Sequence, residues 1–128
     1  MRLLVDTHLL LWAAARSRRL PKAARVLLED PANEVLFSAA SLWEIVIKAA
    51  LRKPDFTVEV ALLRPALAEM GFAELPVSGA HAERLATLPP IHKDPFDRML
   101  AAQAIAERLT LVTRDPAFKR YPVRMLRA

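Results

Sequence analysis

The sequence predicts an α/β fold in three layers, with a mainly parallel sheet of four to five strands between two layers of helices. Short aliphatic runs alternate with longer helical segments along the whole chain. This alternation is typical of parallel strands joined by helices that cover both faces of the sheet. The chain has 128 residues, of which 54% are hydrophobic and 26% charged. That length and composition fit one hydrophobic core, so we expect a single domain over residues 1–128.

The first half of the chain predicts two strand-and-helix units. The expected elements are a strand at 2–5, helices at 7–15 and 21–29, a strand at 34–37, and a helix from 39 to about 51. Asp6 is placed to cap the first helix, and Pro21 suits the first turn of the second. The third helix is apolar almost all round, which predicts that it is largely buried.

Prolines set the expected boundaries in the second half. Pro65 would kink a continuous helix, so we expect that helix to begin near Arg64 and assign no element to residues 55–63. Pro89 and Pro90 break a helix over 78–88, whereas Pro95 opens a long helix to about residue 108. The remaining runs predict strands at 72–77, 109–113 and 123–126.

The composition excludes several kinds of site. The chain has no cysteine, so disulfides, thiolate zinc sites and cysteine nucleophiles are absent. Its three histidines are scattered, and its two glycines are too few for the common phosphate-binding loops. The longest apolar run is residues 9–15, far shorter than the roughly 20 residues of a membrane-spanning helix. We expect a cytoplasmic protein.

The positive charge is concentrated at the two ends of the chain. The formal net charge is +5. Residues 1–25 hold six basic residues and one acid, and residues 114–128 hold five and one, so the middle of the chain is acidic. Such basic ends suit an anionic partner, although a solvated surface accounts for the charge distribution equally well.

Four carboxylates are the strongest candidates for a functional site: Asp6, Glu44, Asp97 and Asp115. Each also has an ordinary structural explanation. Asp6 suits a helix cap, Asp97 suits a helix dipole, and Asp115 before Pro116 suits a turn. Glu44 completes a capping box that starts at Ser41, or pairs with Lys48 one turn later. Asp94 is a natural N-cap and a reserve candidate for the site.

Taken together, the four acids point to a metal. In a parallel α/β sheet, strand C-termini and helix N-termini meet at one edge, where ligands bind. Carboxylates that converge there repel one another, and a hard cation such as Mg²⁺ or Mn²⁺ relieves the repulsion. A carboxylate-held Mg²⁺ suits phosphodiester hydrolysis. Arg114, beside Asp115, is then the best-placed residue to contact the nucleic-acid backbone.

Four segments of the chain resemble the PIN-domain ribonucleases. They are MRLLVDTH at 1–8, SLWEI at 41–45, HKDPFDRML at 92–100 and LVTRD at 111–115. The resemblance is greatest to the VapC toxins of type II toxin-antitoxin systems. It implies a PIN-like fold, Mg²⁺- or Mn²⁺-dependent endonucleolytic cleavage of RNA, a VapB-like antitoxin that covers the site, and a homodimer. The family's acids correspond to Asp6, Glu44, Asp97 and Asp115.

Other polar and aromatic residues receive weaker assignments. Thr7, Ser38 and Thr113 suit either support of the carboxylates or ordinary capping. We expect structural roles for the three histidines, with His81 on an exposed helix. We also expect Trp12 and Trp43, together with Phe96 and Met99, to lie in the core. The first helix has more apolar surface than one core face needs, which suggests contact with a second copy or an antitoxin.

Two other functions remain open from the residues alone. One is a non-catalytic basic module that binds RNA or protein, in which the acids only cap helices. The other is a phosphoryl-accepting Asp6, as in receiver domains or aspartate phosphatases. The second is the weakest, because His8 stands where the phosphatase pattern requires an aspartate.

Overall fold

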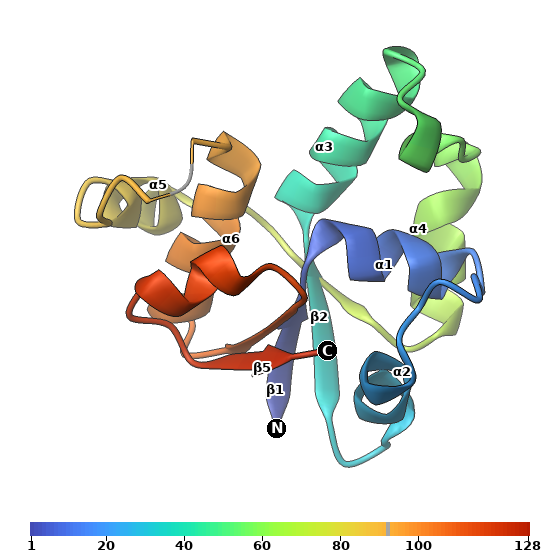
Figure 1. Cartoon of the computed structure of the whole chain (residues 1–128), viewed down its shortest axis with the longest axis horizontal. Helices are drawn as coiled ribbons and strands as arrows, with labels where there is room; N and C mark the ends of the chain where they lie inside the picture. The colour runs from blue at the N-terminus through green and yellow to red at the C-terminus, as the bar shows by residue number, and fades with distance from the viewer. Residues whose placement is uncertain (92) are drawn as a thin grey trace.

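The computed structural model describes residues 1–91 and 93–128. Within this part of the chain, the elements run in the following order (Figure 1): β1 (Arg2–Val5), α1 (Thr7–Ala14), α2 (Lys22–Glu29), β2 (Glu34–Ser38), α3 (Ala39–Ala50), η1 (Pro54–Phe56), α4 (Val60–Glu69), β3 (Ala73–Leu75), α5 (Gly79–Leu85), α6 (Pro95–Ala106), β4 (Thr110–Thr113), η2 (Pro116–Arg120) and β5 (Met125–Arg127).

The five strands form one parallel sheet in the order β3-β2-β1-β4-β5, which confirms the predicted sheet. The chain builds outward from β1 to β3, then crosses to the other side of β1 for β4 and β5. Leu4 of β1 therefore pairs with Leu36 of β2 on one side and with Leu111 of β4 on the other. The strand order reverses at β1, so the crevice at the C-terminal ends of β1 and β4 is the expected ligand site.

Alternate side chains of the central strand enter two separate cores. Leu3 and Val5 pack in the core beneath α1, α2 and α4. Leu4, which points to the opposite face, packs in the core beneath α5 and α6. This two-residue period is that of a strand buried on both faces. Figure 1 shows the two helical layers on either side of the sheet, which confirms the three-layer prediction.

Helix α3 begins and packs differently from the prediction. Ser38 is its N-cap and accepts the backbone N–H of Ala40, so the expected capping box at residues 41–44 does not form. The helix extends past the end of β2, away from the sheet (Figure 1), and only one of its faces meets other elements. The expected burial of Trp43 is therefore wrong, since 63% of its surface is exposed.

Helix α4 contains Pro65 in its interior rather than at its start. Pro65 has no N–H to donate to the carbonyl of Ala61, which ordinarily costs about 3 kcal/mol or more. The burial of Leu63 and Leu67 on the same face offsets this cost. The predicted start near Arg64 is therefore wrong, because tertiary packing outweighs the local preference.

Two further burial predictions also fail. The apolar side chains at positions 9–11 of α1 are all buried within this chain, so they are not available for contact with a partner. His81 is only 1% exposed, although its helix looks solvent-facing in the sequence. Phe96 and Met99 are half-buried. No helix among the described residues is long and apolar enough to cross a bilayer.

Candidate active site at the carboxyl edge of the sheet

Two of the four candidate acids directly follow neighbouring strands. Asp6 comes after β1 and caps α1, where its Oδ1 accepts the backbone N–H of Leu9 at 3.0 Å. Asp115 comes two residues after β4 and caps η2 through the N–H of Ala117. Because β1 and β4 are adjacent and in parallel register, these two caps lie at the same edge of the sheet.

Helices α3 and α6 bring the other two acids to this edge. Glu44 lies in the second turn of α3, and Asp97 lies in the first turn of α6, where Asp94 is the N-cap. All four candidate acids line one pocket of about 160 Å³. The remaining residues that line it are Thr7, His8, Lys48, Asp94 and Phe118. Asp94, the reserve candidate, thus shares the pocket.

Thr113 connects Asp6 to Asp115. Its hydroxyl donates to Asp6 Oδ2 at 2.5 Å and accepts the backbone N–H of Asp115 at 3.0 Å. Thr113, the last residue of β4, therefore orients the carboxyl group of Asp6 and also binds the backbone of Asp115. Ser38, by contrast, caps a helix.

Burial makes Asp6 costly to ionise. Desolvation of its carboxyl group raises the pKa of Asp6 above the ordinary value of 3.8. The hydrogen bonds from Thr113 and Leu9 and the charge of His8 act in the opposite direction, but they only partly offset the desolvation. A nearby cation would favour the charged form of Asp6 and so lower its pKa.

Glu44 is buried and held on both sides. Its carboxyl-bearing side chain belongs to a residue that is only 3% exposed. Its Oε1 accepts the Thr7 hydroxyl at 2.7 Å, and its Oε2 pairs with Lys48 Nζ at 2.5 Å. A buried carboxylate requires such partners, because an unpaired buried charge is strongly unfavourable. Lys48 therefore provides the positive charge nearest to Glu44.

The donor chemistry of the pocket fits Mg²⁺ or Mn²⁺. Its acidic ligands are all carboxylates, which these hard cations prefer. In the observed side-chain conformations, no group of three His, Asp or Glu residues in the described part of the chain is arranged to coordinate a metal ion. Mg²⁺ does not require one, because it is usually held by one or two carboxylates and keeps several waters. The residues therefore fit the metal, provided that the carboxylates turn toward it.

A second pocket, of about 370 Å³, adjoins the first and contains Arg114. Asp6, His8 and Asp115 line both pockets. Leu9, Trp12, Arg19 and Asp55 complete the lining of the second. Trp12, expected in the core, is only half-buried and contacts the ring of His8. His92, expected to be structural, lies outside the described residues.

The sequence of this chain matches the model of a known protein family. The model of the PIN domain matches residues 3–124, nearly the whole sequence. The chain belongs to the PIN domain family. Members of this family are generally nucleases that use divalent metals.

Solved structures with the same fold agree with this assignment. VapBC2 from Rickettsia felis, bound to a promoter DNA fragment, matches with a TM-score of 0.73 at 20% identity, covering 99% of this chain and 98% of that one. VapBC-1 from nontypeable Haemophilus influenzae gives 0.63 at 18% identity, covering 99% and 98%. FitAcB from Neisseria gonorrhoeae gives 0.64 at 20% identity, covering 97% and 96%. No curated protein matches the sequence.

Sequence reasoning missed part of the surroundings of the site in this PIN domain. Lys48 was considered only as a structural partner of Glu44, yet it also lines the pocket. Arg19 belongs to the basic N-terminal segment that suits an anionic partner, but the sequence does not distinguish it from the other basic residues of that segment, and a solvated connection between helices accounts for them equally well. Trp12 was assigned to the core because its neighbours are apolar. Only the packing of α1 shows that it borders the site.

The raised pKa of Asp6 predicts a pH dependence of stability. In the metal-free PIN domain, folding favours the neutral acid. The contribution of Asp6 to stability is therefore full below about pH 4 and declines as the pH rises through the folded pKa. Asp6→Asn keeps an oxygen for the N-cap but cannot ionise. Its free energy of unfolding in urea with EDTA should therefore decline less than that of the wild type between about pH 4 and pH 7. Parallel pH profiles would contradict this prediction.

Proposed function

We propose that this PIN domain is a Mg²⁺-dependent endoribonuclease, the VapC-like toxin of a toxin-antitoxin pair. The observation that carries the proposal is the common pocket of Asp6, Glu44, Asp97 and Asp115 at the switch point of a parallel sheet. Membership of a family of nucleases supports the same conclusion. The net charge of +5 suits a nucleic-acid substrate that the carboxylates alone would repel.

The four acids would hold Mg²⁺, with Mn²⁺ as an alternative. When bound, the metal supplies charge stabilisation at the phosphate and a lowered pKa for an attacking water. Thr113 and Thr7 keep Asp6 and Glu44 in place through their hydroxyls. Arg114, exposed beside Asp115, would contact the RNA backbone. In this proposal no side chain acts as the nucleophile.

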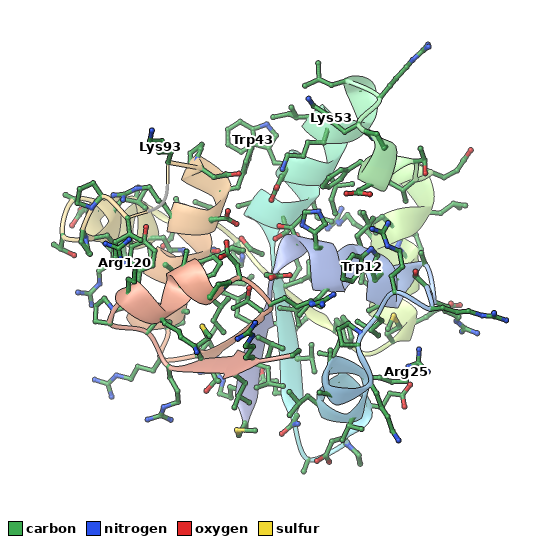
Figure 2. The ribbon with its side chains drawn as sticks, viewed as in Figure 1. Trp12, Arg25, Trp43, Lys53, Lys93 and Arg120 are labelled. Carbon is green, nitrogen blue, oxygen red and sulfur yellow. The ribbon has the colours of Figure 1, made fainter. Side chains whose placement is uncertain are left out.

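A VapB-like antitoxin and a second copy of the chain are the proposed protein partners. The structures of VapBC and FitAcB are complexes of named pairs, and their likeness to this chain supports the first. An apolar stripe on α3 supports a protein contact. Trp43 and Val46 are 63% and 43% exposed, and Ala50 continues the same face. Figure 2 shows Trp43 at the edge of α3 that faces α6. A cytoplasmic location follows from these proposals.

The test is RNA cleavage by the purified protein. We expect cleavage of a single-stranded RNA with Mg²⁺, loss of cleavage with EDTA, and recovery when Mn²⁺ is added in excess. Cleavage that persists in EDTA would overturn the metal mechanism. If calorimetry detects no Mg²⁺ or Mn²⁺ binding at millimolar concentrations but salt-dependent RNA binding persists, the protein is instead a non-catalytic binding module.

Thr7→Val tests the support of Glu44. Valine nearly preserves the shape of this buried side chain but removes the hydroxyl that donates to Glu44 Oε1. Loss of such a supporting hydrogen bond typically lowers metal affinity or activity about 10- to 100-fold. We expect a loss in that range for the cleavage rate at limiting Mg²⁺. Thr57→Val, at an exposed threonine outside both pockets, is the control. Equal rates for the two variants would contradict the role of Thr7.

A further inference from the structure

We propose that Arg19 and Arg114, held against the ring of Trp12, form a binding site for an RNA phosphate next to the cleavage point. This inference rests on the proposed function, because it assigns a second contact to the same substrate. Its evidence is separate and lies in the second pocket, which shares Asp6, His8 and Asp115 with the carboxylate pocket. A chain seated at the carboxylates would therefore continue into this neighbouring pocket.

Trp12 brings two cations together in that pocket. The guanidinium carbon of Arg19 lies 5.1 Å from the centroid of the Trp12 ring, and that of Arg114 lies 5.9 Å from it. Both distances are typical of cation–π contacts. Both arginines line the same pocket, so an anion bound there is attracted by two positive charges. The planar fork of guanidinium matches phosphate oxygens, so phosphate is the expected ligand.

The present partner of Arg19 is easily exchanged. Arg19 Nη1 lies 3.2 Å from Asp55 Oδ1, and the two side chains are 60% and 48% exposed. Such an exposed ion pair contributes little to stability. A phosphate that carries more oxygens and more charge than a carboxylate can therefore replace Asp55.

The charges in the pocket fix the orientation of the substrate. Asp6 and Asp115 also line the carboxylate pocket and so belong to the end that adjoins it, whereas Arg19 and Trp12 line the second pocket alone. A phosphate is repelled at the first end unless a metal is present and is attracted at the second. The scissile phosphate therefore lies at the carboxylates, and a flanking phosphate lies at Arg19. Trp12, labelled on α1 in Figure 2, is a positioning residue for both arginines.

The experiment measures RNA binding without cleavage. In an Asp97→Asn background, fluorescence anisotropy gives the affinity for a labelled single-stranded RNA at several salt concentrations. The slope of log K against log salt is negative, and removing one phosphate contact should reduce its magnitude by about 0.7 and lower the affinity at 0.1 M salt roughly fivefold. We expect both changes for Arg19→Ala, with most of the binding recovered in Arg19→Lys. Arg18→Ala, an exposed neighbour outside both pockets, should change neither by as much.

The role of Trp12 has its own readout. Trp12→Phe keeps an aromatic ring for the two arginines and should preserve the salt slope. Trp12→Leu should reduce it as Arg19→Ala does. In a Trp43→Phe protein, RNA binding should also change the fluorescence of Trp12, and Arg19→Ala should diminish that change. A substitution that only destabilised the fold would not produce this combination of a preserved salt slope in Trp12→Phe, a reduced slope in Trp12→Leu and a fluorescence change that depends on Arg19.

The outcomes separate this inference from the proposed function. Equal slopes and affinities for Arg19→Ala and Arg18→Ala would overturn the phosphate site, even if the wild type cleaves RNA. A slope that depends on Arg19 in a protein that cleaves no RNA with Mg²⁺ would support the phosphate site and overturn the nuclease. Absence of RNA binding by the Asp97→Asn protein would overturn the phosphate site.

Discussion

Asp97→Asn is expected to lower the rate of RNA cleavage in Mg²⁺ by about a thousandfold or more, the scale on which removal of a central catalytic group acts. Asp97 lines the carboxylate pocket but does not cap α6, because Asp94 accepts the first helical N–H. Asparagine is therefore accommodated without loss of the cap. The substitution removes one negative charge from the proposed metal ligands. The measurement is kcat/KM on a labelled RNA, with circular dichroism to confirm folding.

Asp30→Asn is the matched control for this prediction. Asp30 is an exposed aspartate that accepts the backbone N–H of Ala32, and it lies outside the carboxylate pocket. Its replacement should leave the cleavage rate within about twofold of the wild type, as for most surface substitutions. An Asp97→Asn protein that cleaves at the control rate would remove Asp97 from the proposed mechanism.

His81→Ala is expected to lower the free energy of unfolding by about 2–4 kcal/mol. His81 Nδ1 accepts the backbone N–H of Ser78, and Nε2 lies 2.8 Å from Glu107 Oε1. The ring is buried between α5 and α6, with Gln103 Nε2 3.4 Å from Nδ1. Alanine leaves a cavity and removes the acceptor from Ser78 N–H, so both packing and hydrogen bonding are lost. Urea denaturation monitored by circular dichroism gives the value.

Glu83→Ala is the control on the same helix. Its side chain is exposed, so we expect a change within about 0.5 kcal/mol. A loss of less than about 1 kcal/mol in His81→Ala would contradict the prediction, because it would show that the buried ring contributes little to the free energy of unfolding. Because His81 lies away from both pockets, any His81→Ala protein that remains folded should bind RNA as the wild type does.

Most of the fold could be predicted because its signals are local. The aliphatic strand around Leu4, the cap at Asp6 and the proline that opens α6 each depend on neighbours within a few residues. The errors occurred where distant contacts outweigh local preference. Pro65 remains inside α4 because Leu63 and Leu67 are buried. Trp43 is exposed because α3 continues beyond the sheet.

The same distinction between local signals and distant contacts applies to the candidate site. Asp6 and Asp115 could be identified because each follows the end of a strand, and Glu44 and Asp97 because each lies near the start of a helix; both positions fall at the same edge of a parallel sheet. The partners of those acids were harder to predict. Thr7 reaches Glu44 across the contact between α1 and α3, and no spacing in the sequence encodes that hydrogen bond.

The amino-acid sequence alone was sufficient for the class of fold and for placing the four candidate acids at one edge of the sheet, because these depend on residue type and on the order of strands and helices. Tertiary structure decided which groups surround the acids. It joined the two pockets, paired Lys48 with Glu44, and set Arg19 and Arg114 against Trp12. Those contacts link residues far apart in the chain, so only packing determines them.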